Sequence, residues 1–78
     1  MMVTIYPNPS NGLFTISTLT LNSKPIVYLV SDVTGKIIKQ GEFNSGSHIL
    51  DLEKIASGVY VLNLSNAEVN QTVKLIKQ

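Results

Sequence analysis

The chain of 78 residues contains no cysteine, no tryptophan and no arginine, and it has a single histidine. Without cysteine it can form neither a disulfide nor a thiolate zinc site, and it has no thiol for redox or nucleophilic chemistry. Burial of apolar side chains therefore has to supply nearly all of the folding free energy. The lack of cysteine is compatible with a reducing or an oxidising compartment.

Charge is also sparse, since six lysines and five carboxylates leave a formal net charge of +1. A nucleic-acid-binding protein needs a dense basic face, usually with arginines that bind phosphate in a bidentate way, so this class is excluded. No apolar run approaches the roughly 20 residues that span a bilayer, and the first residues lack the basic and apolar regions of a signal peptide. The sequence therefore predicts no nucleic-acid partner and no membrane insertion.

Strand-forming residues are abundant, because valine, isoleucine and threonine occupy 22 of the 78 positions. Alternation of apolar and polar residues, with turn formers roughly every 10 to 14 residues, divides the chain into seven extended segments. The predicted strands are Met2 to Tyr6, Leu13 to Leu21, Ile26 to Asp32, Lys36 to Phe43, Ser47 to Leu52, Val59 to Ser65 and Val69 to Lys77. We expect one all-β domain, a seven-stranded antiparallel immunoglobulin-like or Greek-key β-sandwich.

Two connections between these strands indicate specific structures. Asp32 and Gly35 stand first and fourth in a four-residue turn, which predicts that the third and fourth strands form an antiparallel hairpin. Gly58 and Tyr60 open the sixth strand in the manner of a tyrosine corner, in which the phenol binds a backbone group a few residues upstream.

Two strands depart from simple alternation. The third, Ile26 to Asp32, is apolar on both faces in its first half, which predicts a central strand covered on both sides. In the second strand the apolar residues change parity between Ile16 and Leu19, so we expect a bulge near Ser17 or Thr18.

No catalytic or metal-binding pattern is present. His48 has Ser47 and Asp51 nearby, but residues three apart in a strand point to opposite faces, which favours an edge or surface histidine. The carboxylates are dispersed, and no calcium-binding or phosphate-binding loop occurs. The sequence predicts no enzyme activity, no metal and no cofactor. The lack of tryptophan also weakens a sugar-binding reading.

Four parts of the chain resemble one protein family. They are Ile5–Ile16 with the pattern YPNP…G.FTI, Val30–Ile38 with D..G+.V, Ile49–Tyr60 with dl..L..G.Y, and Lys74–Lys77 with K.+K. In this order they are similar to the type A C-terminal sorting domain of the type IX (Por) secretion system, and the resemblance covers essentially the whole chain.

The resemblance implies a non-catalytic secretion signal. Such domains end the secreted cargo proteins of outer-membraned bacteria, are read by an outer-membrane translocon, and are commonly removed by a sortase-like peptidase that can attach the cargo to anionic lipopolysaccharide. The implied location is the periplasm in transit and then the outer-membrane surface or the medium. Residues 1–78 would be a monomeric domain excised from a larger secreted protein, with Met1 added and the cleavage site, normally upstream of Tyr6-Pro7, missing.

The expected recognition residues lie in the last strand, whose free edge a partner strand could pair with. They are Lys74, Leu75, Ile76 and Lys77. The alternative role for the two lysines is to protect an edge strand from aggregation. Structural roles are expected for Pro7, Asn8, Pro9, Gly12, Asp32, Gly35, Gly58 and Tyr60.

The rival hypothesis is an immunoglobulin-like or fibronectin-like accessory module that binds carbohydrate or a surface partner. A glycan array, or the position of the domain in its parent protein, would separate the two.

Overall fold

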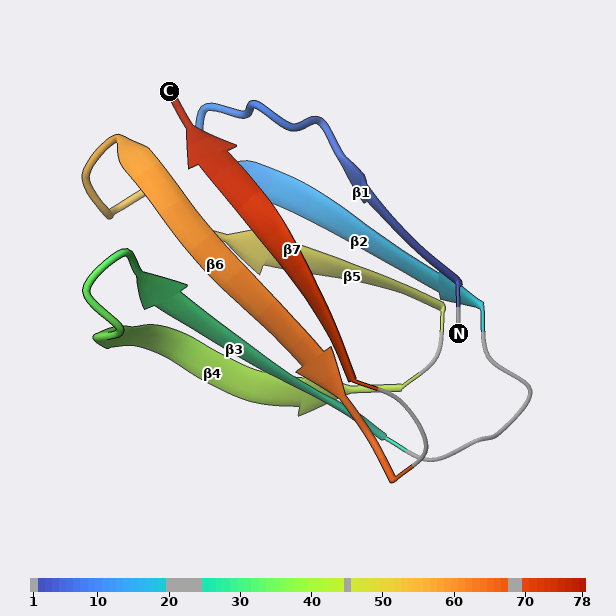
Figure 1. Ribbon diagram of the computed structural model, residues 1–78. Helices are drawn as coiled ribbons and strands as arrows, with labels where there is room; N and C mark the ends of the chain where they lie inside the picture. Colours follow the sequence, from blue (N-terminus) through green and yellow to red (C-terminus); the bar gives the residue numbers. More distant parts are fainter. Residues whose placement is uncertain (1, 20–24, 45, 68–69) are drawn as a thin grey trace.

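The computed structural model describes residues 2–19, 25–44, 46–67 and 70–78, and it shows seven strands in two layers (Figure 1). The strands are β1 (Met2–Tyr6), β2 (Leu13–Leu19), β3 (Ile26–Asp32), β4 (Ile37–Phe43), β5 (Gly46–Asp51), β6 (Gly58–Ser65) and β7 (Asn70–Lys77). Wherever the described residues allow a comparison, each strand end lies within one residue of its predicted position. The predicted ends at Leu21 and Val69 lie outside the described residues.

The strands form a three-stranded sheet, β1-β2-β5, and a four-stranded sheet, β4-β3-β6-β7, in which every neighbouring pair is antiparallel. Pairing of β2 with β5 and of β3 with β6 gives the Greek-key crossing between the sheets. The prediction of an all-β antiparallel sandwich is confirmed. No helix in the described ranges is long and apolar enough to cross a lipid bilayer.

The core lies between the two sheets, because each strand turns alternate side chains inward. The three-stranded sheet and the segment after it contribute Phe14, Ile16, Leu50 and Leu52; the four-stranded sheet contributes Ile26, Tyr28, Val30, Tyr60, Leu62, Leu64 and Leu75.

The predicted bulge in β2 was wrong. Pairing of β2 with β1 and with β5 runs without a shift, and the inward series Phe14, Ile16 continues to Thr18 while Leu19 is 66% exposed. Thr18 can lie inside because its hydroxyl donates to Gly46 O and accepts from Gly46 N, both at 3.2 Å. The register shift occurs instead in the β3–β4 pair, between Val30 and Ser31.

The prediction for β3 was half right. It is central, between β4 and β6, but only its inner face is covered, and Val27 on the outer face is 45% exposed. A two-layer sandwich offers each sheet only one inner face, so an apolar outer residue stays at the surface.

Candidate functional site

Segments far apart in the sequence meet at one end of the sandwich, which we call the motif end. They are residues 7–12, 32–36, 52–57 and 74–78. The strand registers bring them together, since Gly58 lies opposite Lys77 and Asp32 lies opposite Tyr60. Figure 1 shows the segment that follows β1 running beside the C-terminal end of β7.

Asn8 binds the backbone of β7 through its side-chain amide. Its Nδ2 donates to Lys74 O at 2.8 Å, and its Oδ1 accepts from Ile76 N at 3.0 Å. A neighbouring strand would offer one donor and one acceptor to these same groups. The side chain of Asn8 therefore acts in place of a strand on this part of the outer edge of β7.

Ser10 continues this pairing with its backbone. Ser10 N donates to Ile76 O at 3.0 Å, and Gln78 N donates to Ser10 O at 2.8 Å, which makes a parallel bridge between Ser10 and Lys77. The Ser10 hydroxyl, buried at 5% exposure, donates to Leu13 O at 2.6 Å and accepts from Gly12 N at 3.1 Å. Ser10 therefore ties the first loop to the last strand.

These contacts occupy groups on the edge of the last strand with which a partner strand was expected to pair. Four outward-facing backbone groups of the C-terminal half of β7 and the residue after it are already occupied: Lys74 O, Ile76 N, Ile76 O and Gln78 N. That half of the edge is not free, and the expectation that it is free was wrong. No sequence pattern indicated that residues 8 and 10 would cover it.

Lys77 is a buried lysine, exposed by only 8%. Its Nζ donates to Glu53 O at 2.9 Å and to Ile55 O, so the ammonium is held by carbonyls of the β5–β6 connection. The expectation that Lys77 is displayed at the surface was wrong. Strand parity could have revealed this, because Lys77 lies on the same face as the buried Leu75, while Lys74, three residues away, lies on the other.

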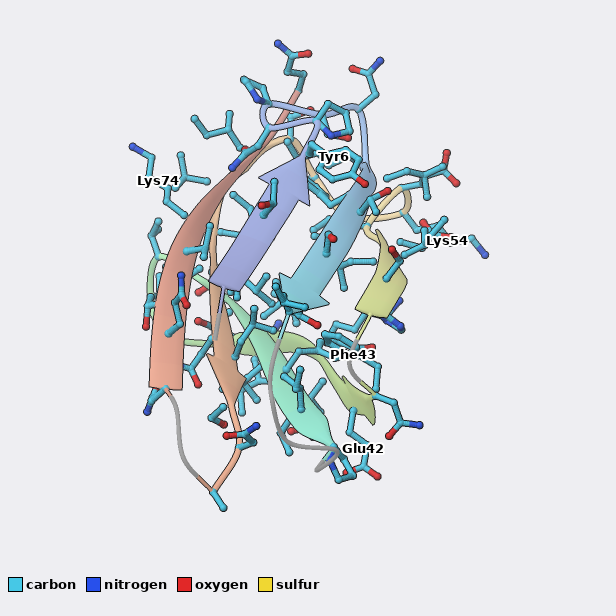
Figure 2. All side chains as sticks on the ribbon, turned by 90° about the vertical axis from the view of Figure 1, so that its right-hand side faces the viewer. Tyr6, Glu42, Phe43, Lys54 and Lys74 are labelled. Carbon is cyan, nitrogen blue, oxygen red and sulfur yellow. The ribbon has the colours of Figure 1, made fainter. Side chains whose placement is uncertain are left out.

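The other three residues expected to serve recognition also differ in placement. Lys74 is exposed, Ile76 is half-buried and Leu75 is fully buried. Figure 2 shows the side chain of Lys74 pointing away from β7 and that of Lys54 pointing away on the opposite side of the molecule. Among the four, Lys74 is the most exposed.

The tyrosine corner predicted at the start of the sixth strand is confirmed. The hydroxyl of Tyr60 donates to Ala56 O at 2.6 Å, and the ring is 7% exposed. Gly58 lies between these residues, at the beginning of β6. The bond fixes the arch that carries the chain from β5 to β6, and the same arch holds the carbonyls that bind Lys77.

The predicted hairpin turn after β3 is also confirmed. Gly35 N donates to Asp32 O at 3.0 Å, and Gly35 has φ of +92°, a conformation that favours glycine. The Asp32 carboxylate accepts from the Thr34 hydroxyl at 2.6 Å and from the amides of Thr34 and Lys36. The hydroxyl bond is the main cause of a lowered pKa for Asp32; the two amides and the charge of Lys36 add to it, and desolvation partly opposes it.

We expect this turn to weaken in acid. Because the folded pKa of Asp32 lies below its unfolded value, the contribution to stability is complete above the ordinary aspartate pKa of about 3.9 and is lost as pH falls through the folded pKa. Urea unfolding of wild type and Asp32→Asn between about pH 5 and pH 2 measures this. The variant should lack part of the acid-dependent loss, and two superimposable pH profiles would contradict the expectation.

Gly12 brings the first loop against the β5–β6 connection. Leu52 N donates to Gly12 O at 2.7 Å, and a Cβ added at Gly12 would lie 2.8 Å from the Cα of Glu53. Pro7 and Pro9, on the same loop, are exposed. The motif end is thus one packed junction of the first loop, the β5–β6 arch and the last strand.

The residues considered for catalysis do not converge. His48 lies on the edge strand β5, half-buried, with its ring stacked on Phe43 at a centroid distance of 4.7 Å. Asp51 faces the other way and accepts from Glu53 N. In the described part of the chain no group of three or more His, Cys, Asp or Glu could hold a metal ion.

One groove among the described residues has a volume of about 220 Å³. Its lining is formed by Ile38, Lys39, Asp51, Leu52, Lys54 and Ile55. This is below the roughly 300 Å³ at which small-molecule pockets begin, and Lys39 Nζ already donates to Asp51 O across it.

Comparison with known proteins identifies a family and a relative. The model of a family described as "Secretion system C-terminal sorting domain" matches residues 4–78. The chain is also 33% identical, over 70 residues, to an endo-acting ulvan lyase of Formosa agariphila. That alignment covers 88% of this chain and 13% of the lyase, so the chain spans only a small part of the length of this relative.

Proposed function

Because the chain belongs to the secretion system C-terminal sorting domain family, we propose that the type IX export machinery recognises it as a folded domain, at the motif end. A sorting domain of this family is a C-terminal secretion signal that directs proteins through type IX secretion to the cell surface or the medium. The family is non-catalytic.

One observation carries this proposal. The sequence motifs that mark the family lie far apart in the chain, yet Asn8 of the first motif hydrogen-bonds Lys74 of the last, 66 residues away. A partner that binds this junction contacts both motifs at once. A partner that bound only an extended C-terminal segment would make no contact with the first motif.

Within the junction we assign the contact with the machinery to Lys74. Its ammonium is exposed, whereas Leu75 and Lys77 point inward and Ile76 is half-buried. Leu75 and Lys77 then serve recognition only through the stability of the fold that carries Lys74, and Ile76 serves it through its backbone amide and carbonyl, which bind Asn8 and Ser10. Pro7 and Pro9 are exposed and flank Asn8, which binds the backbone of Lys74.

The family also indicates the kind of parent protein and partners to expect. We propose that the chain is the tail of a larger secreted protein and that its partners are the outer-membrane translocon and a sortase-like peptidase. The matched relative is an enzyme far longer than this chain, which fits a cargo protein with a sorting tail.

The test uses a reporter with a signal peptide, fused at its C-terminus to this domain and expressed in a bacterium with type IX secretion. The wild-type fusion should reach the surface or the medium, and deletion of residues 73–78 should leave it in the periplasm. Lys74→Glu should lower export by about tenfold, equivalent to about 1.4 kcal/mol of recognition free energy, with the urea midpoint of the purified domain unchanged.

Lys54→Glu is the matched control, since it reverses the same charge at an exposed lysine of the motif end on the opposite side of the molecule. Its export should stay at the wild-type level. An equal loss for both variants would assign the effect to net charge and refute the role of Lys74. Export that does not depend on the domain at all would refute the proposed function.

A further inference from the structure

Groups of the same domain occupy the C-terminal half of the outer edge of the last strand. The groups that bond it come from a side chain, that of Asn8, and from the backbone of Ser10, both in the β1–β2 loop. A partner strand could pair with this half of β7 only after residues 8–10 had been displaced. It would then replace existing hydrogen bonds by equivalent ones, with no net gain in their number.

The same segment is anchored on its other sides. Leu75 is fully buried, Lys77 binds two carbonyls of the β5–β6 connection, and the backbone of β7 pairs with β6 as far as Lys77. Extraction of the tail would break all of these contacts together. A partner that recognises the tail within the folded domain breaks none of these contacts.

We infer that the machinery recognises the last strand while it is still paired in the sheet and bound by residues 8–10, which we call the closed form. We also infer that Asn8 is a positioning residue: it holds residues 74–78 in the sheet and so keeps Lys74 in a fixed place. This inference rests on the proposed function. It separates two kinds of partner: a surface that contacts side chains of the folded tail, which we infer, and a strand that adds to a released tail.

The first experiment locks the tail with a disulfide. Val59 and Ile76 are cross-strand partners, and the amide and carbonyl of Ile76 point away from β6 toward Asn8 and Ser10. They therefore form a non-hydrogen-bonded pair with Cα atoms about 4.5 Å apart, which a disulfide can bridge. The chain has no other cysteine, so Val59→Cys with Ile76→Cys can form only this bond within it.

In the reporter fusion the locked domain should be exported within twofold of the wild type, and the exported product should carry the disulfide on a non-reducing gel. The matched control is Ile76→Cys alone. Disulfide-linked fusion retained in the periplasm, with the single variant exported, would overturn the closed-form reading. If the wild-type fusion itself stayed in the periplasm, the proposed function would have failed instead.

The second experiment tests the role of Asn8. Asn8→Ala should raise the hydrogen-exchange rate of the Ile76 amide about tenfold or more, with the central amides of β6 unchanged, and should lower export. Adding the Val59→Cys and Ile76→Cys pair should then restore export, because the disulfide holds the tail where Asn8 did. Undiminished export of Asn8→Ala, or no rescue by the disulfide, would overturn the positioning role.

Discussion

Replacement of Lys77 by methionine is expected to lower the free energy of unfolding by about 3 kcal/mol. The ammonium is buried and donates to Glu53 O and Ile55 O. Methionine keeps the apolar stem but leaves both carbonyls without this donor, and a buried acceptor that loses its partner costs about 1–3 kcal/mol. The release of the ammonium from its buried position offsets only part of this loss.

The expected loss is large for a domain of this size. At about 0.05–0.15 kcal/mol per residue, a chain of 78 residues is stable by roughly 4–12 kcal/mol. Urea unfolding of the purified domain gives the value directly. Lys74→Met is the matched control, since Lys74 is exposed, and it should change stability by less than about 0.5 kcal/mol.

Substitutions at Lys77 and at Lys74 should therefore have different effects when stability and export are measured on the same variants. Lys77→Met should lose stability, and its export should fall only as far as the folded fraction falls. Lys74→Glu should keep its stability and lose export. Equal stability losses at the two positions would show that Lys77 is not held as described.

Replacement of Gly12 by alanine should also lower the free energy of unfolding by about 3 kcal/mol, because two unfavourable effects add. Gly12 has φ of +140°, where a side chain is strained by about 1–3 kcal/mol. The new Cβ would in addition lie 2.8 Å from the Cα of Glu53, a backbone atom that cannot rotate away, and such overpacking costs about 1–3 kcal/mol.

Gly46→Ala separates the two causes. Gly46 has a similar φ, +122°, but a Cβ added there meets nothing within 4 Å, so only the backbone strain remains. Its loss of unfolding free energy should be smaller than that of Gly12→Ala by about 1–2 kcal/mol. If urea unfolding gave the same loss at both positions, the close contact between the first loop and the β5–β6 connection would be of no energetic consequence.

Predictions from the sequence succeeded where one short segment contains all of the interacting groups. The Asp32 carboxylate binds the amide two residues ahead, and the Tyr60 hydroxyl binds a carbonyl four residues back, so both structures follow from local spacing. The strand boundaries follow in the same way, from alternation within each segment. The family motifs were also readable, because each is a short run of residues in a fixed order.

The failures share a different cause. A bulge was predicted near Ser17 or Thr18 because parity was judged from apolar residues, while the backbone of Gly46, 28 residues from Thr18, satisfies the Thr18 hydroxyl inside the sandwich. For Lys77, the charge suggested the surface, and only the carbonyls of a distant connection make burial possible.

The sequence alone determined that this chain is an all-β sandwich of seven strands, where its hairpin turn and tyrosine corner lie, and to which family it belongs. Those properties depend on residues close together along the chain. Only the tertiary structure decided that Asn8 and Ser10 occupy the C-terminal half of the outer edge of β7, that Lys77 is buried and that Lys74, on the same strand, is exposed. The physical reason is that strand register and the packing of one sheet on the other bring together groups up to 68 residues apart in the sequence. The residue pattern within a single segment does not indicate which distant groups it will contact.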